Sequence, residues 1–347
     1  MKVLFLFHPY GTASMSAAIC EVSEVVFCPA KRHYGTPVGM RRMNWREFFS
    51  LRRRILAHEF DYIIAYGCEE GLWRPNRAFL KNIVHAVKKL LFYFPAFGLR
   101  LLLPTIKKSG TRLIIYDYDD LTIIPRMRWP YLDACHLYFK MHTPINLFKA
   151  FLFQTKRDQI IWNVFENKRY QAWIKKIRPV SVGTAFKPEI LQYISEEKKY
   201  DVFFSGATHY SQVRQDGLKV LEQLRDEGLR IALPGRMPFP EFMRTCSESW
   251  LVLAPEGAEW DSGRPYETLL MKSVPLTNYP TVRRYRPLVD GVHCIFFPPE
   301  PGLLREVILN ALKDKERLRR IAQAGHEYVL QHHTHQKIVE YMLNEQA

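Results

Sequence analysis

The chain has 347 residues, of which 47% are hydrophobic and 14% aromatic, and this composition indicates a globular protein of about two domains. Its six cysteines form no CxxC pair, which argues against a zinc ribbon or a redox motif and favours a reducing, cytoplasmic compartment. The formal charge of +15 is concentrated in the first half, because residues 1–190 carry 30 Lys and Arg against 14 Asp and Glu, whereas residues 191–347 carry 20 against 21.

Short apolar runs in the first half, separated by helical or turn-forming stretches, predict a mostly parallel sheet. The expected strands are Val3–Phe7, Val22–Cys28, Asp61–Tyr66, Thr111–Tyr116 and Ala134–Phe139. Residues 1–7 are too short for the apolar core of a signal peptide, so they predict a buried first strand.

The stretch Leu90–Leu103 is strongly apolar, but it does not predict a transmembrane helix. A span needs about 20 apolar residues. Within the longer stretch Lys81–Pro104, which contains this apolar core, charged residues or proline occur at Lys88, Lys89, Pro95 and Arg100. A basic, aromatic-rich stretch of this kind fits a membrane interface, and it fits a buried helix or a partner-facing patch equally well.

Residues 187–200 are expected to form a linker, after which the second half restarts with the strand Asp201–Ser205 and the turn at Gly206. A helix is expected over 212–228, a strand and turn over 230–235, and a helical region over 303–331. The sequence also predicts a short amphipathic helix over 336–343, preceded by a surface loop that contains His332, His333 and His335.

The segment Glu259–Glu267 (EWDSGRPYE) is the most informative part of the chain. It follows the apolar run Trp250–Ala254 and precedes a short helical stretch, so it lies at the carboxyl end of a strand. Open α/β sheets bind ligands at that edge, and helix N-termini attract phosphate. The two glutamates around Arg264 therefore predict a site for an anionic ligand that carries hydroxyl groups.

The second half resembles the donor domain of GT-B glycosyltransferases, in which two Rossmann-like domains face each other across a cleft. The resemblance rests on the strand and turn Asp201–Gly206, the turn at Gly235, and residues 262–276, and it covers residues 200–330. It implies an α/β fold in which residues 1–188 bind an acceptor and residues 200–330 bind a nucleotide sugar. It also implies that a helix within 331–347 packs back on the first domain.

Two more local similarities concern individual residues. Glu259 and Glu267 fit the E-x7-E spacing of many retaining GT-B enzymes, with Glu256 as a competing first position because the usual Phe-Gly is absent. Residues 201–214 and 264–268 are similar to the donor site of the phage DNA β-glucosyltransferases, which implies that Arg214 and Arg264 bind the diphosphate and Glu267 the ribose.

The resemblance implies a donor site made of Ser205, Gly206, Arg214, Gly235, Glu259, Ser262, Gly263, Arg264, Tyr266 and Glu267. The chemistry of these residue types agrees with it. An arginine offers a bidentate fork to phosphate, and a carboxylate can accept hydrogen bonds from two ribose hydroxyls. The plainer alternatives are a solvated surface arginine for Arg214 and a glutamate stabilised by the helix dipole for Glu267.

The acidic stretch Asp117–Asp120 has three interpretations. Asp119, or next Asp117, is expected to act as the general base that deprotonates the acceptor hydroxyl. Carboxylates spaced Asp-x-Asp after a strand also resemble the divalent metal site of GT-A glycosyltransferases, so a divalent metal is a second interpretation. Exposed acids that cap the next helix are the third.

These observations predict a glycosyltransferase that moves a sugar from a UDP- or GDP-sugar donor to a hydroxyl of an envelope polysaccharide or glycolipid, with no further cofactor. The basic first half and Leu90–Leu103 motivate this acceptor, a cytoplasmic location and contact with the inner membrane surface. DNA is the second acceptor. Asp119 as base implies inversion, whereas the E-x7-E spacing favours retention. A non-catalytic carbohydrate- or membrane-binding module and a GT-B-type epimerase are the alternatives.

Overall fold

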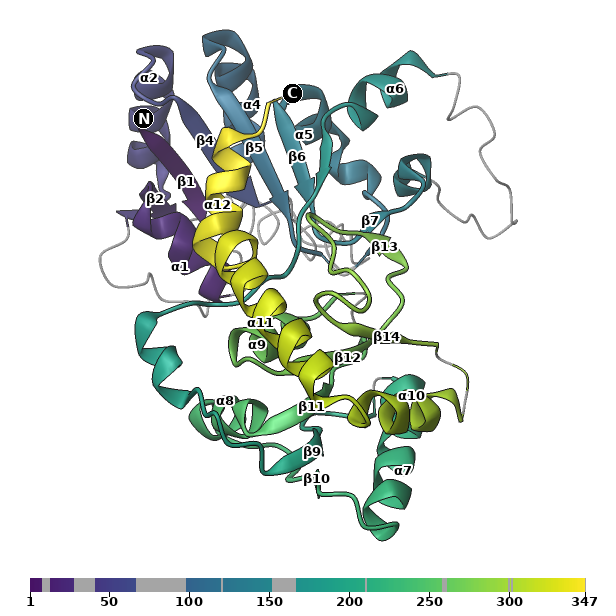
Figure 1. Ribbon diagram of the computed structural model, residues 1–347. Coiled ribbons are helices and arrows are strands. Elements are labelled where there is room, and N and C mark those ends of the chain that lie inside the picture. Colours follow the sequence, from purple (N-terminus) through teal and green to yellow (C-terminus); the bar gives the residue numbers. More distant parts are fainter. Residues whose placement is uncertain are drawn as a thin grey trace, which may run out of the picture. The chain divides into compact units, whose positions relative to one another are not determined.

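The computed structural model describes residues 1–7, 13–27, 41–66, 98–119, 121–151, 167–209, 211–257, 261–298, 300 and 302–346 (Figure 1). The chain forms two compact units, Met1–Val180 with Tyr341–Ala347, and Ser181–Glu340. The polypeptide therefore crosses between the units twice. The last helix, α12 (His335–Asn344), begins in the second unit and ends in the first.

The first unit contains a seven-stranded parallel sheet with the strand order β3-β2-β1-β4-β5-β6-β8. Its strands are β1 (Val3–Phe7), β2 (Glu24–Phe27), β3 (Arg41–Arg42), β4 (Tyr62–Tyr66), β5 (Arg112–Asp117), β6 (Leu137–Lys140) and β8 (Ile177–Pro179), with β7 (Thr143–Pro144) after β6. Its helices are α1 (Ala13–Glu21), α2 (Trp45–Leu56), α4 (Gly98–Ser109), α5 (Trp129–Ala134) and α6 (Lys168–Ile174).

The core of the first unit lies between one face of this sheet and the helices that follow β3, β4, β5 and β6. Alternate strand residues such as Leu4, Leu6, Ile63 and Ile115 are fully buried with apolar side chains of α2 and α4. On the opposite face, the Tyr341 ring packs edge-on against Phe139 at 5.3 Å between ring centroids. Both faces of the sheet are covered, as parallel sheets require.

The second unit contains a five-stranded parallel sheet with the strand order β10-β9-β11-β12-β14. Its strands are β9 (Tyr200–Phe203), β10 (Ile231–Ala232), β11 (Ser249–Leu253), β12 (Val274–Asn278) and β14 (Ile295–Phe297), with β13 (Val282–Arg283) before β14. Its helices, besides the first part of α12, are α7 (Gln212–Asp226), α8 (Phe239–Ser247), α9 (Arg264–Leu270), α10 (Leu303–Leu312) and α11 (Lys315–His332).

Two apolar clusters cover the two faces of the second sheet. One contains Leu251 and Leu253 with residues of α7, α10 and α11, and the other contains Phe203 and Val252 with residues of α8 and α9. Ile190 lies inside the expected linker 187–200, yet it is buried in the second cluster. The unit begins at Ser181, so the residues expected to form a linker are part of it.

Several expected elements differ in their bounds from the observed ones. The helical region expected over 303–331 is two helices, because the Asp314 carboxylate accepts a hydrogen bond from the Arg317 amide at 2.8 Å and starts a new helix there. The prediction that His332, His333 and His335 lie in a surface loop is wrong. His332 ends α11, His335 begins α12, and His333 between them is fully buried.

The apolar stretch Leu90–Leu103 is described only from residue 98 onward, where it forms the start of α4. Across the described part of the chain, every helix is too short or too polar to reach from one side of a bilayer to the other.

Candidate functional site

The sheet of the second unit reverses its direction of growth between β9 and β11. The chain leaves β9, forms β10 on one side, and returns to form β11 on the other. The loops that follow β9 and β11 therefore diverge, and this is the position at which open α/β sheets bind ligands. Most of the expected donor-site residues lie in these two loops or in the first turns of α7 and α9.

Arg214, in the first turn of α7, connects the two loops. Its Nη1 donates a hydrogen bond to the Ala207 carbonyl oxygen at 3.2 Å, and its Nη2 donates to the Pro255 carbonyl oxygen at 3.3 Å. A Cβ on Gly257 would lie only 2.6 Å from Nη2, so a side chain at this position would require the guanidinium to shift. Arg214 thus holds the loops together and places a fixed positive charge on them.

Arg264, the first residue of α9, lies against the loop after β9. A Cβ on Gly206, whose φ is +153°, would lie 2.5 Å from Nη1 of Arg264. The Nε and Nη1 atoms of Arg264 are buried and have no hydrogen-bond acceptor among the described residues. Burial lowers the pKa of this guanidinium, against the opposing effect of Glu267. Buried N–H groups without acceptors are costly, so the geometry favours an anionic ligand here.

Glu267 lies one turn along α9 from Arg264. Burial raises the pKa of its carboxyl group, and the charge of Arg264 opposes that rise. A Cβ on Gly263 would be 3.8 Å from Oε1, so the carboxylate lies close to the loop backbone. No hydrogen bond from another described residue reaches this carboxylate, which leaves its oxygens available to accept hydroxyl groups of a ligand.

Tyr266 lies in the core behind the loop. Its hydroxyl donates a hydrogen bond to Oδ2 of Asp261 at 3.3 Å, and its ring lies 4.8 Å from that of His333. Asp261 is almost fully buried and forms an ion pair with Arg284 at 3.2 Å. This network lies directly before Ser262 and fixes where the chain enters α9.

The remaining expected donor-site residues are backbone groups and short side chains. Ser205 Oγ donates a hydrogen bond to the Gly235 carbonyl oxygen at 2.5 Å, which ties the loop after β9 to the turn after β10. Gly235 has φ +74°, a conformation that favours glycine. Ser262 and Gly263 lie immediately before α9 and are partly exposed.

Glu259 and Glu256 are the two candidates for the first glutamate of the E-x7-E spacing. Glu259 lies outside the described residues. Glu256 follows β11, and its backbone N–H donates a hydrogen bond to the Asn278 side-chain oxygen at 3.0 Å. Burial raises the pKa of the Glu256 carboxyl group, and Arg284 opposes that rise.

The expected base residues lie at the carboxyl end of β5 in the first unit, within a cluster of four charges. Asp117 is fully buried and contacts Arg128 at 2.9 Å, Lys140 at 3.3 Å and the Tyr138 hydroxyl at 2.6 Å. Burial alone would raise its pKa, but Lys140 and Arg128 hold that pKa below its ordinary value. Asp119 keeps a partly exposed edge and accepts a hydrogen bond from Arg128 at 2.5 Å.

Comparisons with known proteins place this geometry in a known architecture. No protein family and no curated protein matches the sequence. Solved structures match over 99% of the chain. HepE from Anabaena, solved with UDP, is 13% identical over 98% of its own length with a TM-score of 0.52. An α-glucosyltransferase solved with UDP and a 13-mer DNA containing a HMU base is 11% identical over 98% of its length, at 0.54. The lipopolysaccharide outer core galactosyltransferase WaaB is 12% identical over 99% of its length, at 0.53.

The chain has the GT-B fold. The expected α/β class with two Rossmann-like domains is therefore confirmed. Identities this low establish shared architecture alone, so the activity has to be argued from the residues.

The ion pairs of Asp117 and Asp119 argue against the interpretation of these residues as a metal site. A GT-A-like site requires carboxylates with charge to spare, whereas these two are paired with the guanidinium of Arg128 and the ammonium of Lys140. The donor set does not fit a divalent cation. Within the described residues, no group of three His, Cys, Asp or Glu side chains is placed to hold a metal.

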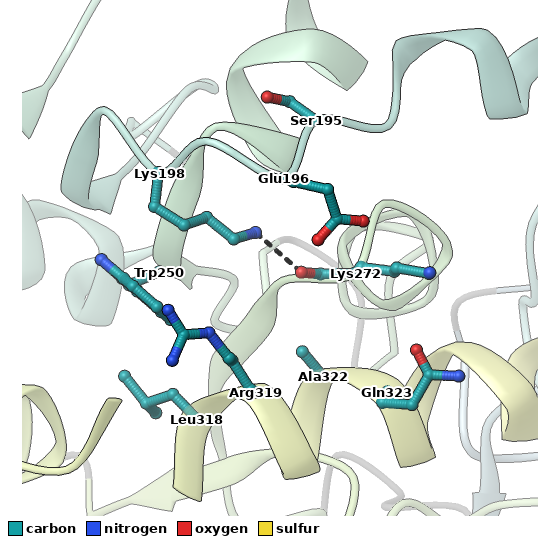
Figure 2. A pocket seen from close by; sticks show the side chains of 9 residues that line it. All are labelled: Ser195, Glu196, Lys198, Trp250, Lys272, Leu318, Arg319, Ala322 and Gln323. Atoms are coloured by element: carbon teal, nitrogen blue, oxygen red, sulfur yellow. Dashed lines mark hydrogen bonds between the residues drawn. The ribbon is translucent and has the colours of Figure 1, made fainter. Parts of the chain in front are cut away.

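A separate cavity of about 210 Å³ lies at the opposite edge of the second sheet, near the amino ends of β9 and β11 (Figure 2). The ammonium of Lys198 beside it donates hydrogen bonds to the carbonyl oxygens of Ser247 and Lys272 at 2.6 and 2.8 Å, and to Ser273 Oγ at 3.1 Å. Burial lowers the pKa of Lys198 to about 8. Because its donors are already used, Lys198 fastens three chain segments and leaves little for a ligand.

Sequence reasoning missed the residues that support the site. Asp261, Arg284, Arg128 and Lys140 are buried charges, and only their spatial pairing reveals them. One local signal was present, since Asp261 lies inside the segment Glu259–Glu267, directly before the donor loop. Nothing local marks Arg284 as its partner.

Proposed function

We propose that this protein is a glycosyltransferase that transfers a sugar from a nucleotide-sugar donor to a hydroxyl acceptor. The observation that carries the proposal is the Arg264 guanidinium, buried against Gly206 with Nε and Nη1 lacking acceptors among the described residues. Glu267 beside it has a buried carboxylate, and no hydrogen bond from another described residue reaches it. A guanidinium suits a diphosphate and a carboxylate suits the hydroxyl groups of a ribose, so the pair supports a nucleotide-sugar site.

The reaction follows from these charges. When the acceptor oxygen attacks the anomeric carbon, the bond from that carbon to the diphosphate oxygen breaks and the leaving group gains negative charge. Arg264 and Arg214 are fixed cations at the switch point of the sheet, so they stabilise that charge without moving. Gly206 and Ala207 bring backbone amides of the loop after β9 to the same place.

The acceptor proton needs a base, and we assign this role to Asp119. Its partly exposed edge lies at the carboxyl end of a strand in the first unit, whereas Asp117 is fully buried and orients Arg128, which in turn holds Asp119. The first unit would then bind the acceptor and the second the donor. Asp119 as base favours inversion, and retention through Glu259 or Glu256 is the alternative.

For the donor, a uridine nucleotide is the first choice. HepE and the α-glucosyltransferase that share the fold were solved with UDP. For the acceptor, the basic first half favours an anionic glycolipid or polysaccharide of the cell envelope, reached from the cytoplasmic side.

The test is binding and hydrolysis of UDP-sugars and GDP-sugars, followed by thermal unfolding and by release of UDP or GDP. A bound nucleotide raises the unfolding temperature by mass action. Arg264→Ala should weaken nucleotide binding by about 10- to 100-fold, since charge-assisted hydrogen bonds contribute about 1.5–3 kcal/mol. Glu267→Ala should weaken it by about tenfold.

The matched controls are Arg225→Ala and Glu222→Ala, which change two exposed residues of α7. Both variants should bind nucleotide as tightly as the unmodified protein does. If no nucleotide binds, or if the controls weaken binding as much as the site variants, the enzyme proposal fails and a non-catalytic binding module replaces it.

DNA is the second candidate acceptor, because the α-glucosyltransferase of the same fold was solved with DNA and the first half of this chain is basic. It predicts duplex binding that falls steeply with salt, together with transfer of the sugar to DNA. Transfer to lipid-linked or polysaccharide acceptors, with none to DNA, decides for the first candidate.

A further inference from the structure

Helix α2 carries two separate apolar stripes. Phe48, Leu51 and Ile55 are buried and hold the helix on the sheet of the first unit. Trp45, Phe49 and Leu56 lie elsewhere on its circumference, at 47%, 50% and 39% exposure. At about 100° per residue these three side chains fall within an arc of about 40°, roughly 100° away from the buried stripe. The exposed stripe is therefore a distinct face of a firmly anchored helix.

The exposed stripe is ordered as well as apolar. The rings of Trp45 and Phe49 stack at 6.1 Å between centroids with an angle of 24° between their planes, and Phe48 meets both rings edge-on. The helix start is fixed by Asn44, whose side chain accepts a hydrogen bond from the Glu47 amide at 2.9 Å. Two exposed aromatic rings are thus held in one orientation.

Cations border this stripe. Arg52 lies on one side of it and Arg46 and Arg53 on the other, all three are exposed, and none has an ion pair with a described residue. The single acidic residue of the helix, Glu47, lies away from the stripe and contacts Arg41 at 3.4 Å. The face therefore combines apolar rings with uncompensated positive charge.

The neighbouring helix α4 packs against α2 (Figure 1). It carries exposed residues of the same kinds. Leu101 is 45% exposed, and Lys107 and Lys108 are exposed in its last turn. Both helices cover the same face of the sheet, as their shared core shows. We call the exposed residues Trp45, Arg46, Phe49, Arg52, Arg53, Leu56, Leu101, Lys107 and Lys108 the α2 face.

We propose that the α2 face docks on an anionic phospholipid surface, with Trp45, Phe49 and Leu56 in the interfacial layer and the arginines at the phosphates. Tryptophan and phenylalanine prefer that layer, and arginine stems extend along apolar surface with their charge in water. A nucleic acid would use the arginines and leave the apolar stripe in water. A second copy of this chain would oppose arginines to arginines across a two-fold axis.

The experiment uses the full-length protein and sedimentation with two kinds of vesicle, pure phosphatidylcholine and phosphatidylcholine with phosphatidylglycerol. Binding is expected only to the anionic vesicles. Arg52→Glu with Arg53→Glu should weaken it at least tenfold, and Trp45→Ala with Phe49→Ala should weaken it to a similar extent, while circular dichroism and UDP binding remain unchanged. Lys219→Glu with Arg225→Glu on the second unit is the charge-matched control and should bind vesicles as the unmodified protein does.

A second measurement reports insertion directly. Lipids brominated in the upper acyl chain should quench part of the tryptophan fluorescence, and Trp45→Phe should keep vesicle binding but lose most of that quenching. Failure to bind anionic vesicles overturns the proposal, and so does binding that the control pair weakens as much as the α2 pairs. Salt-sensitive duplex binding that depends on Arg52 and Arg53, without vesicle binding, would assign the face to nucleic acid instead. Vesicle binding and quenching are measured without nucleotide, so they do not depend on the glycosyltransferase proposal. If the protein binds no UDP, unchanged circular dichroism alone serves as the folding control.

Discussion

At the scale of single residues, the site depends on close contact between loop glycines and arginine side chains. Gly206 and Gly257 lie so near the guanidinium groups of Arg264 and Arg214 that a side chain at either position would require the guanidinium to shift. The sequence predicted Arg264 and Glu267 because both lie in a polar loop at a strand end. It could not predict Asp261 and Arg284, since a buried ion pair shows itself only when two distant segments meet.

The first prediction concerns Gly206. We expect Gly206→Ala to lower nucleotide affinity at least tenfold, because its Cβ would displace Arg264. We also expect it to destabilise the fold by about 1–3 kcal/mol through strain at φ +153°. Gly228→Ala is the matched control, since it also has a positive φ but no atom near its Cβ. Titration of UDP against thermal unfolding measures both, and equal affinity losses in the two variants would contradict the placement.

The second prediction separates Asp117 from Asp119. Asp117→Asn should destabilise the protein by roughly 3–5 kcal/mol, because it leaves the buried Lys140 without its carboxylate and Arg128 with that of Asp119 alone. Asp119→Asn should lower turnover by about 100-fold or more with a much smaller loss of stability, since it removes the proposed base and leaves a partly exposed edge. Urea unfolding and initial rates decide, and an Asp119→Asn enzyme with full activity would remove Asp119 as the base.

At the scale of secondary-structure elements, strand and helix patterns were predictable and their ends were less so. Periodicity located β1, β4, β5 and β11 to within a residue or two. It merged α10 with α11, because the intervening Asp314 looks like any other charge on a helix surface. It also misplaced the histidines of the α11–α12 junction, since only tertiary packing buries His333 between Tyr266 and Tyr328.

The third prediction follows from that junction. His333 accepts a hydrogen bond from the Ser181 hydroxyl at Nδ1 and donates one from Nε2 to the Arg286 carbonyl oxygen, so it is buried as a neutral ring. Burial lowers its pKa to about 3. Below about pH 6.5 the His333 side chain binds a proton in the unfolded chain but stays neutral in the folded protein. The free energy of unfolding should therefore fall by up to about 1.4 kcal/mol per pH unit between pH 6 and 4.

His333→Gln keeps an N–H for the Arg286 carbonyl oxygen and removes the titration. The slope of unfolding free energy against pH, measured with urea, should become shallower in this variant than in the unmodified protein. His58→Gln, at an exposed position, is the control. An unchanged slope in His333→Gln would show that other groups dominate the acid loss of stability.

At the scale of the whole molecule, charge follows the division into units. The first unit carries 29 Lys and Arg against 14 Asp and Glu, whereas the second carries 21 against 21. The charge asymmetry was readable from the sequence, and the resemblance to GT-B enzymes implied that a helix within 331–347 returns to the first domain. The contacts that hold this return were not predictable. Tyr341 donates a hydrogen bond to the Pro179 carbonyl oxygen at 3.3 Å, and Arg178 holds Glu345 at 2.9 Å.

The fourth prediction tests this return. Deleting residues 341–347 should destabilise the first unit by about 3 kcal/mol or more, because Met342 and Leu343 are buried and Phe139 loses its cover. The second unit should still be stabilised by UDP, so calorimetry should show one transition at lower temperature and one that still responds to nucleotide. A deletion that shifts both transitions equally would mean that the units unfold together.

The return of α12 also has a consequence for biosynthesis. Arg178 and Glu345 are 167 positions apart, and one face of the first sheet stays incomplete until residues 341–345 have left the ribosome. The second unit is contiguous from Ser181 to Glu340 and can therefore complete itself while the first still waits. The amino-terminal half would then be the last to finish, with Phe139 and its neighbours exposed to chaperones in the interval.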